Sequence, residues 1–184
     1  MTYPNFNVGE TLRAADMNAV GLWLVKTQTV GTGVSSVTVN NAFSADYENY
    51  KIIYSGGQSS IAEKMHLQLA ASGTVSSTLY YGTLAWVNVG SGAVSGAADN
   101  NGAQFSFAGG SVGAVNGGAS ATFDLLNPFE AKRTRIHNAQ TAYGTVYGTY
   151  TGVHDLATSY DGFRFTMGSG TLTGGTIRVY GYRN

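Results

Sequence analysis

Histidines offer the most direct route to catalysis or metal binding, and their spacing argues against both. His66, His137 and His154 are the three histidines of the sequence, and none lies in an HExxH or comparable metal-ligand spacing. His66 follows the outward-facing phase of a predicted strand, so we expect an exposed side chain. His154 precedes Asp155 in a predicted turn. The sequence therefore predicts no metal site and no cofactor.

Nucleophiles and carboxylates also fail to form a recognisable active site. No cysteine occurs, which excludes thiol catalysis and zinc-thiolate sites, and no GxSxG elbow accompanies the many serines. Carboxylates such as Asp46, Glu48 and Asp161 fit predicted turns better than a glycosidase pair. The Gly-x-Gly pairs lie between predicted strands rather than before a helix, unlike a phosphate-binding loop. We expect no enzymatic activity.

Aromatic and amide side chains point instead to binding. Tyrosines outnumber phenylalanines twelve to eight, and a tyrosine can bury its ring while its hydroxyl forms a hydrogen bond. A weak sugar site needs an aromatic face together with amide, carboxylate or backbone groups. For each aromatic residue the alternative is packing in the core or at a subunit interface. The candidate ligand-binding residues are Tyr80, Tyr81, Trp86, Asp99, Asn100 and Asn101.

A period of two in the apolar residues predicts that strands position these side chains. Many short strands separated by glycine-rich turns are typical of a sandwich or barrel. Residues 91–101 and 109–120 have few large apolar side chains, so we expect long surface loops there that carry part of the binding site. The predicted strands lie near residues 35–40, 50–55, 64–69, 83–89, 103–107, 121–125, 133–137, 145–151, 162–167 and 176–183.

A short helix is expected over residues 11–26, before the first strand. Thr11 is a plausible N-cap, and Asp16 lies near the N-terminus of the helix, where the helix dipole favours a carboxylate. The apolar residues extend well beyond one helix face. The helix either lies on the sheet of its own subunit or packs against copies from neighbouring subunits. The predicted oligomer interface residues are Leu12, Ala19, Leu22, Trp23 and Leu24.

Length and charge limit the remaining possibilities. A chain of 184 residues fits one main domain, and we place an N-terminal attachment segment at residues 1–33 and a β-domain at residues 34–184. Ten basic residues balance ten acidic ones without a one-signed block, which argues against nucleic-acid binding. Residues 1–18 lack a signal-peptide pattern, and no apolar run is long enough for membrane insertion. We expect a soluble chain that starts at Met1.

Several stretches of the sequence resemble one group of viral proteins. Phe6-Asn-Val-Gly-Glu-Thr-Leu-Arg-Ala-Ala-Asp-Met-Asn-Ala is similar to the G-x-x-L-x-A-A-D-x-N segment that opens many bacteriophage tail-fibre and appendage proteins. Ala42-Phe-Ser-Ala-Asp-Tyr-Glu-Asn-Tyr-Lys-Ile, Asn127-Pro-Phe and Gly174-Gly-Thr-Ile-Arg-Val-Tyr-Gly-Tyr-Arg resemble their fibre tip domains. These patterns consist of turn and strand residues and carry no chemistry of their own.

The resemblance implies an all-β, jelly-roll-like antiparallel β-sandwich that assembles as a homotrimer. It further implies a virion location after assembly in the host cytoplasm. The N-terminal segment would then contact other virion proteins, while distal loops bind a bacterial surface glycan or protein. The alternative is a purely structural virion component, such as a head fibre, a decoration protein or a baseplate connector. Binding to host cells would favour the first function, and binding only to virions would favour the second.

Overall fold

The described part of the chain consists of antiparallel strands. The computed structural model describes residues 21–111 and 118–182, and for residues 138–143 it describes the backbone only. Within these ranges no helix occurs, so the prediction of an all-β antiparallel protein is confirmed. The strands are β1 (Leu22–Thr29), β2 (Ser36–Val39), β3 (Asn49–Ser59), β4 (Lys64–Ala71), β5 (Thr74–Val75), β6 (Tyr80–Asn88), β7 (Ala93–Gly102), β8 (Phe105–Ser111), β9 (Ala119–Leu126), β10 (Thr134–Tyr143), β11 (Val146–His154), β12 (Gly162–Met167), β13 (Leu172–Thr173) and β14 (Thr176–Tyr182).

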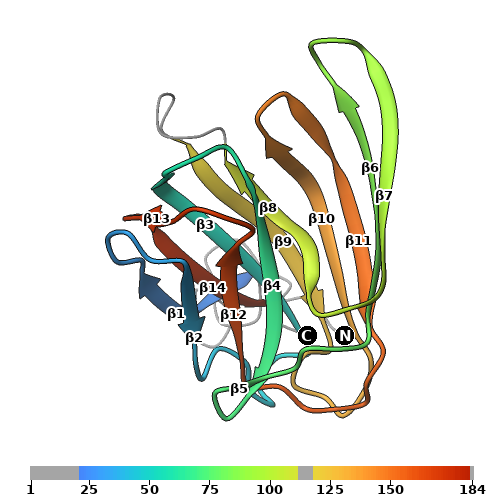
Figure 1. The fold of residues 1–184 in the computed structure, drawn as a ribbon. Helices are drawn as coiled ribbons and strands as arrows, with labels where there is room; N and C mark the ends of the chain where they lie inside the picture. Colours follow the sequence, from blue (N-terminus) through green and yellow to red (C-terminus); the bar gives the residue numbers. More distant parts are fainter. Residues whose placement is uncertain (1–20, 112–117, 183–184) are drawn as a thin grey trace, which may run out of the picture.

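Hydrogen bonds join the strands into one branched sheet, which we divide into two layers (Figure 1). The long layer has the strand order β1-β14-β3-β9-β10-β11-β6-β7. The short layer has the order β2-β12-β4-β8. Strand β8 also pairs with β9 through Gly110 and Ser120, so β9 connects the two layers. The short strands β5 and β13 pair with β4 and β3.

Aromatic side chains fill the space between the layers. The ring of Phe165 on β12 contacts Tyr54 on β3 and Phe123 on β9. Farther along the long layer, Phe105 on β8 contacts the ring of Tyr150 on β11. Full burial of one large apolar side chain contributes about 1.5–3 kcal/mol to the free energy of folding. These contacts therefore hold the short layer against one face of the long layer.

Period-two alternation explains which residues enter this core. On β9, Ala121, Phe123 and Leu125 are buried, whereas Thr122 between them is exposed. Successive side chains of a strand point to opposite faces, so the apolar phase faces the short layer. The strand predicted over residues 162–167 has the same bounds in the structure. Alternation thus located β9 and β12 and the buried side of β9 correctly.

The predicted helix is wrong where the structure describes it. Residues 22–26 belong to β1, which pairs with β14 from Leu22 to Thr29. The rest of the expected helix, including Leu12 and Ala19, lies outside the described residues. Leu22 and Leu24 are exposed on β1, while Trp23 is partly buried. Pairing with β14 satisfies the backbone of this apolar stretch, so part of the segment assigned to residues 1–33 belongs to the main sheet.

Where the structure describes them, the two predicted loops are also largely strand. Residues 93–102 form β7, which pairs with β6 over most of its length. Residues 109–111 end β8 and residues 119–120 begin β9, while residues 112–117 lie outside the described ranges. Small and polar residues disfavour strands only weakly, and a ready hydrogen-bonding edge on β6 outweighs that preference.

Gly109 shows why part of one expected loop belongs to the sheet. A Cβ atom on Gly109 would lie 2.5 Å from the Cβ of Ala121 on β9 and 3.0 Å from the methyl group of Met65 on β4. Only glycine fits at this approach of three strands. The glycine that indicated a loop in the sequence therefore permits close packing between the layers.

Candidate functional site

The long layer has one face toward the core and one exposed outer face. On β11, Tyr150 is buried between the layers, whereas its neighbours Thr149 and Thr151 are exposed. Side chains that are directly paired across antiparallel strands point to the same face. The register of β10, β11, β6 and β7 therefore determines which residues meet on the outer face.

Two cross-strand rows define the part of the outer face with the most functional groups. Directly opposite residues in antiparallel strands have Cβ atoms about 4.5–5.5 Å apart, so the members of one row are neighbours. The first row comes from β10, β11 and β6, and the second extends to β7. The first row is Arg135, Val153 and Tyr81, and the second is His137, Thr151, Thr83 and Ala98.

These rows border a shallow depression of about 440 Å³, which we call the Arg135 depression. Its volume lies in the lower part of the range of roughly 300–1,000 Å³ found for ligand pockets. A guanidinium, a phenol, an amide and two hydroxyl groups line it, so it offers both hydrogen-bond donors and acceptors. The lining side chains include Tyr81, Thr83, Asn100, Arg135, Thr151 and Val153.

The candidate residues from the sequence separate into two groups. Tyr81, Asp99 and Asn100 line the Arg135 depression, so the structure brings half of the candidates together. Tyr80 instead lies fully buried with its ring stacked on His154. Its hydroxyl accepts a hydrogen bond from the backbone N–H of Leu69, and burial raises the pKa of the phenol. Tyr80 is therefore a core residue.

Trp86 and Asn101 also contribute to the fold rather than to the Arg135 depression. Trp86 is partly buried and packs against the hydrophobic core, which agrees with the alternative considered for it. Asn101 adopts a positive φ of 53°, and its side-chain oxygen accepts a hydrogen bond from the backbone N–H of Leu79. This contact fixes the connection into β6. Neither residue lines the Arg135 depression.

The Asp99 carboxylate is committed to hydrogen bonds inside the protein. It accepts them from the hydroxyl of Ser106 at 2.6 Å, the backbone N–H of Ser106 at 3.1 Å and the hydroxyl of Tyr150 at 2.6 Å. Burial and this carboxylate raise the pKa of Tyr150, which stays a neutral donor. Asp99 thus ties β7 to β8 and β11. Its neighbour Asn100 is exposed and remains the better candidate for ligand contact.

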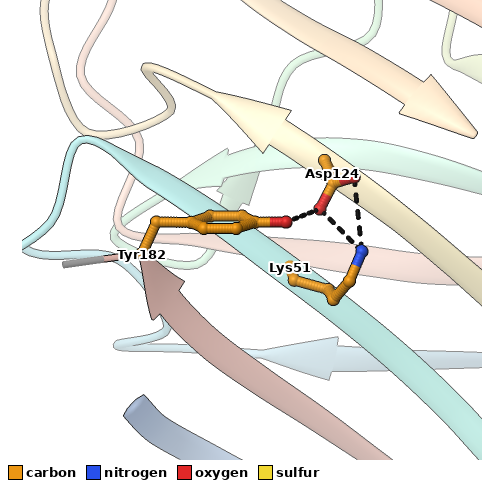
Figure 2. Close-up of polar contacts among 3 residues, drawn as sticks. All are labelled: Lys51, Asp124 and Tyr182. Atoms are coloured by element: carbon orange, nitrogen blue, oxygen red, sulfur yellow. Dashed lines mark hydrogen bonds and ion pairs between the residues drawn. The ribbon is translucent and has the colours of Figure 1, made fainter. Parts of the chain in front are cut away.

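A second polar cluster lies on the outer face nearer to β1. Figure 2 shows Lys51 from β3 and Tyr182 from β14, whose polar groups both contact the carboxylate of Asp124 on β9. The ammonium group of Lys51 lies 3.0 and 3.3 Å from the two oxygens of Asp124, and the hydroxyl of Tyr182 lies 2.6 Å from the first. The opposite charges of Lys51 and Asp124 balance, so the cluster joins three strands without adding net charge.

The protonation of this cluster follows from its contacts. Burial lowers the pKa of Lys51, but the hydrogen bond and the charge of Asp124 raise it more, so the net direction is upward. Burial and the bond to Asp124 raise the pKa of Tyr182. Both groups therefore keep their protons near neutral pH. A second depression of about 400 Å³, the Tyr182 depression, is lined by Asn49, Asp124, Leu126, His137 and Tyr182.

Two of the three histidines differ from the expectation. His66 was predicted to be exposed, but it is only 6% exposed, and its Nδ1 lies 2.9 Å from the carbonyl oxygen of Ser106. His154 ends β11 rather than lying in a turn, and its Nε2 contacts the hydroxyl of Tyr160 at 2.6 Å. His66 is buried beside Ser106 of the paired strand β8, a contact between strands that alternation alone does not reveal. His137 is exposed, and among the described residues no group of three or more potential metal ligands occurs.

Sequence reasoning missed Arg135 and Thr151 as members of the site. Both lie on the exposed phase of strands that the sequence predicted, and this phase is the signal that could have identified them. Their proximity depends on the pairing of β10 with β11 and of β11 with β6, which the sequence does not specify.

Comparison with known proteins adds no relative. The chain matches no family model, no curated protein and no solved structure. In the part of the chain that the structure describes, no helix is long and apolar enough to cross a membrane.

Proposed function

We propose that this chain is a non-catalytic appendage protein of a bacteriophage virion, of the tail-fibre type, that binds the host-cell surface. Its fold is then a jelly-roll-like β-sandwich, with the short layer against one face of the long layer, assembled as a homotrimer. The resemblance of residues 6–19 to the opening segment of such proteins supports this proposal. The segment preceding β1 would contact other virion proteins.

The observation that carries the binding function is the convergence of Tyr81, Asn100, Thr151 and Arg135 on one depression. Asn100 and Arg135 are exposed, and Tyr81 is half-buried. Surface glycans present apolar ring faces and hydroxyl groups, which aromatic, amide and hydroxyl side chains can bind. Weak contacts at one site gain strength when an oligomer presents several copies.

A purely structural virion role remains the second candidate, because a different surface favours it. Tyr147, Val87 and Val94 form an exposed cross-strand row on the outer face of β11, β6 and β7. Val94 is 80% exposed, and no second strand pairs with the outer edge of β7 within the described residues. An apolar row beside a free strand edge suits contact with another protein.

Adsorption of the fluorescently labelled protein separates the two functions. We expect it to bind cells of at least one strain in a bacterial panel and to lose most of this binding in the Asn100→Ala, Tyr81→Ser double variant. Thr27→Ala, at an exposed position on β1 away from the depression, is the control and retains binding. Binding to virions but to no cells would contradict the receptor-binding function and favour the structural one.

A further inference from the structure

We propose that the Arg135 and Tyr182 depressions belong to one groove that binds an extended, acidic oligosaccharide across the strands of the long layer. This inference rests on the proposed function, because it names the ligand class that the host surface would present. The ligand is a chain of several linked sugars that carries carboxylate groups.

The two depressions are continuous through a third. A depression of about 380 Å³ is lined by His137, Thr83, Thr151 and neighbouring residues. His137 also lines the Tyr182 depression, while Thr83 and Thr151 also line the Arg135 depression. The three depressions therefore share side chains along the second cross-strand row, and we call their union the groove.

The length of the groove fits a chain rather than a single sugar. Between Tyr182 on β14 and Tyr81 on β6 lie strands β3, β9, β10 and β11. Neighbouring strands are about 4.8 Å apart, so the two tyrosines are separated by roughly 24 Å across the sheet. A ligand that contacts both must span several sugar rings. The groove crosses the strands, so side chains from several neighbouring strands line it.

The lining chemistry suits sugars along this length. Tyrosine rings lie at both ends, and the apolar side chains of Leu126 and Val153 flank Arg135 on the neighbouring strands. The side chains of Thr151 on β11 and Thr83 on β6 are exposed near the Tyr81 end. Such alternation of apolar faces and hydrogen-bonding groups matches the alternation of ring faces and hydroxyls in a glycan.

The positive charge of Arg135 favours an acidic glycan over a neutral one. Arg135 is exposed and forms no ion pair with any side chain that the structure describes. The nearest carboxylate on β9, that of Asp124, is already paired with Lys51 at 3.0 Å. Asp99 lies three strands away, about 14 Å, and its carboxylate accepts bonds from Ser106 and Tyr150. Arg135 thus leaves one positive charge locally unbalanced, and its planar fork binds carboxylates in bidentate geometry.

A glycan array tests the inference. The probes are acidic oligosaccharides from bacterial capsules and lipopolysaccharides, in short and long forms, each beside a carboxyl-reduced neutral partner. We expect binding to long acidic probes, weaker binding to short ones, and a loss of at least about tenfold for the carboxyl-reduced partners. Added salt should weaken binding, since the contact is charge-assisted.

Variants of the groove make the test specific. Arg135→Ala should weaken binding to acidic probes about tenfold, and Arg135→Lys should restore part of it. His137→Ala should weaken the binding of long probes more than that of short ones, because His137 lines two of the depressions. Arg178→Ala removes the same charge from the same face outside the groove and should leave binding unchanged.

The inference is overturned if Arg135→Ala binds like the parent, if Arg178→Ala weakens binding equally, or if neutral partners bind as tightly. It is also overturned if the protein adsorbs to bacterial cells but to no acidic probe, and in that case the proposed function survives. Absence of adsorption to any cells, with binding to virions, defeats the proposed function itself.

Discussion

At the scale of single residues, Asp99 shows how a side chain selected for ligand contact can serve the fold instead. Its carboxylate reaches the hydroxyl of Tyr150 because Gly82, the β6 residue between them, has no side chain. A Cβ atom on Gly82 would lie 2.2 Å from the Tyr150 hydroxyl oxygen, so only glycine leaves room for this contact. Gly82, Tyr150 and Asp99 therefore form one arrangement across three strands.

Asp99→Ala should lower the free energy of unfolding by about 1–3 kcal/mol, because it leaves the buried Tyr150 hydroxyl without its acceptor. Asn100→Ala at the adjacent exposed position should change it by less than about 0.5 kcal/mol. Urea denaturation of both variants and the parent measures the difference. Equal stability of the two variants would contradict the role given to Asp99.

Two buried histidines make stability depend on pH. Burial lowers the pKa of both His66 and His154, since it disfavours the charged ring. For His154, Nδ1 is buried without a hydrogen-bond partner among the described residues, and Nε2 contacts Tyr160. The folded state therefore holds both rings neutral at pH values where the unfolded chain already binds protons.

The melting temperature should fall as the pH decreases from about 7.5 to about 5. Above the ordinary histidine pKa of about 6.5 the two states bind equal numbers of protons at these rings, and below it the unfolded state binds more. Stability is thus complete above that pH and is lost toward the lowered pKa of the folded state. Thermal scans of the parent and of the His66→Gln, His154→Gln double variant provide the measurement. A melting temperature of the parent that does not change with pH would contradict the conclusion that the folded state keeps His66 and His154 neutral.

At the scale of elements, the sequence predicted strands better than their connections. Regular alternation on β4, β9 and β12 located these strands, because each has a buried face rich in large apolar residues. Strand β7 was missed because its sequence, AVSGAADNNG, has little apolar alternation and its side chains are mostly exposed. Its existence depends on pairing with β6, a tertiary effect that local propensity does not include.

The predicted helix failed for a related reason. Residues 22–29 have apolar side chains at both helical and alternating spacings, and both patterns fit so short a segment. The hydrogen bonds offered by β14 decide between them. For the site, the sequence identified Tyr81 and Asn100 by residue type, whereas Arg135 depended on register. Registers between distant strands are the information that a single sequence lacks.

At the scale of the whole molecule, two edges of the long layer expose apolar side chains. Leu22 and Leu24 on β1 are 43% and 55% exposed, and Val94 lies on β7 at the opposite edge. Neither β1 nor β7 contains proline, and β7 contains no lysine, although such residues commonly protect strand edges. Assembly would cover these edges, which is consistent with the proposed trimer.

Light scattering coupled to gel filtration should show a trimer at micromolar concentration. The double variant Leu22→Lys, Leu24→Lys should shift the mass toward the monomer, because it places charge on the predicted interface. Thr27→Lys, which adds charge at another exposed position of the same strand, is the matched control. Circular dichroism verifies that all variants retain the β spectrum. A monomeric parent would contradict the prediction of an obligate oligomer.

The position of β14 between β1 and β3 also constrains the order of folding. During synthesis β1 emerges before every other described strand, whereas β14 emerges after them all. Contacts between segments so far apart in sequence form slowly, and unpaired edges of incomplete chains are prone to aggregation. A nascent chain that lacks β14 leaves β1 without its partner and one edge of β3 open. The long layer can therefore close only after translation has passed Tyr182.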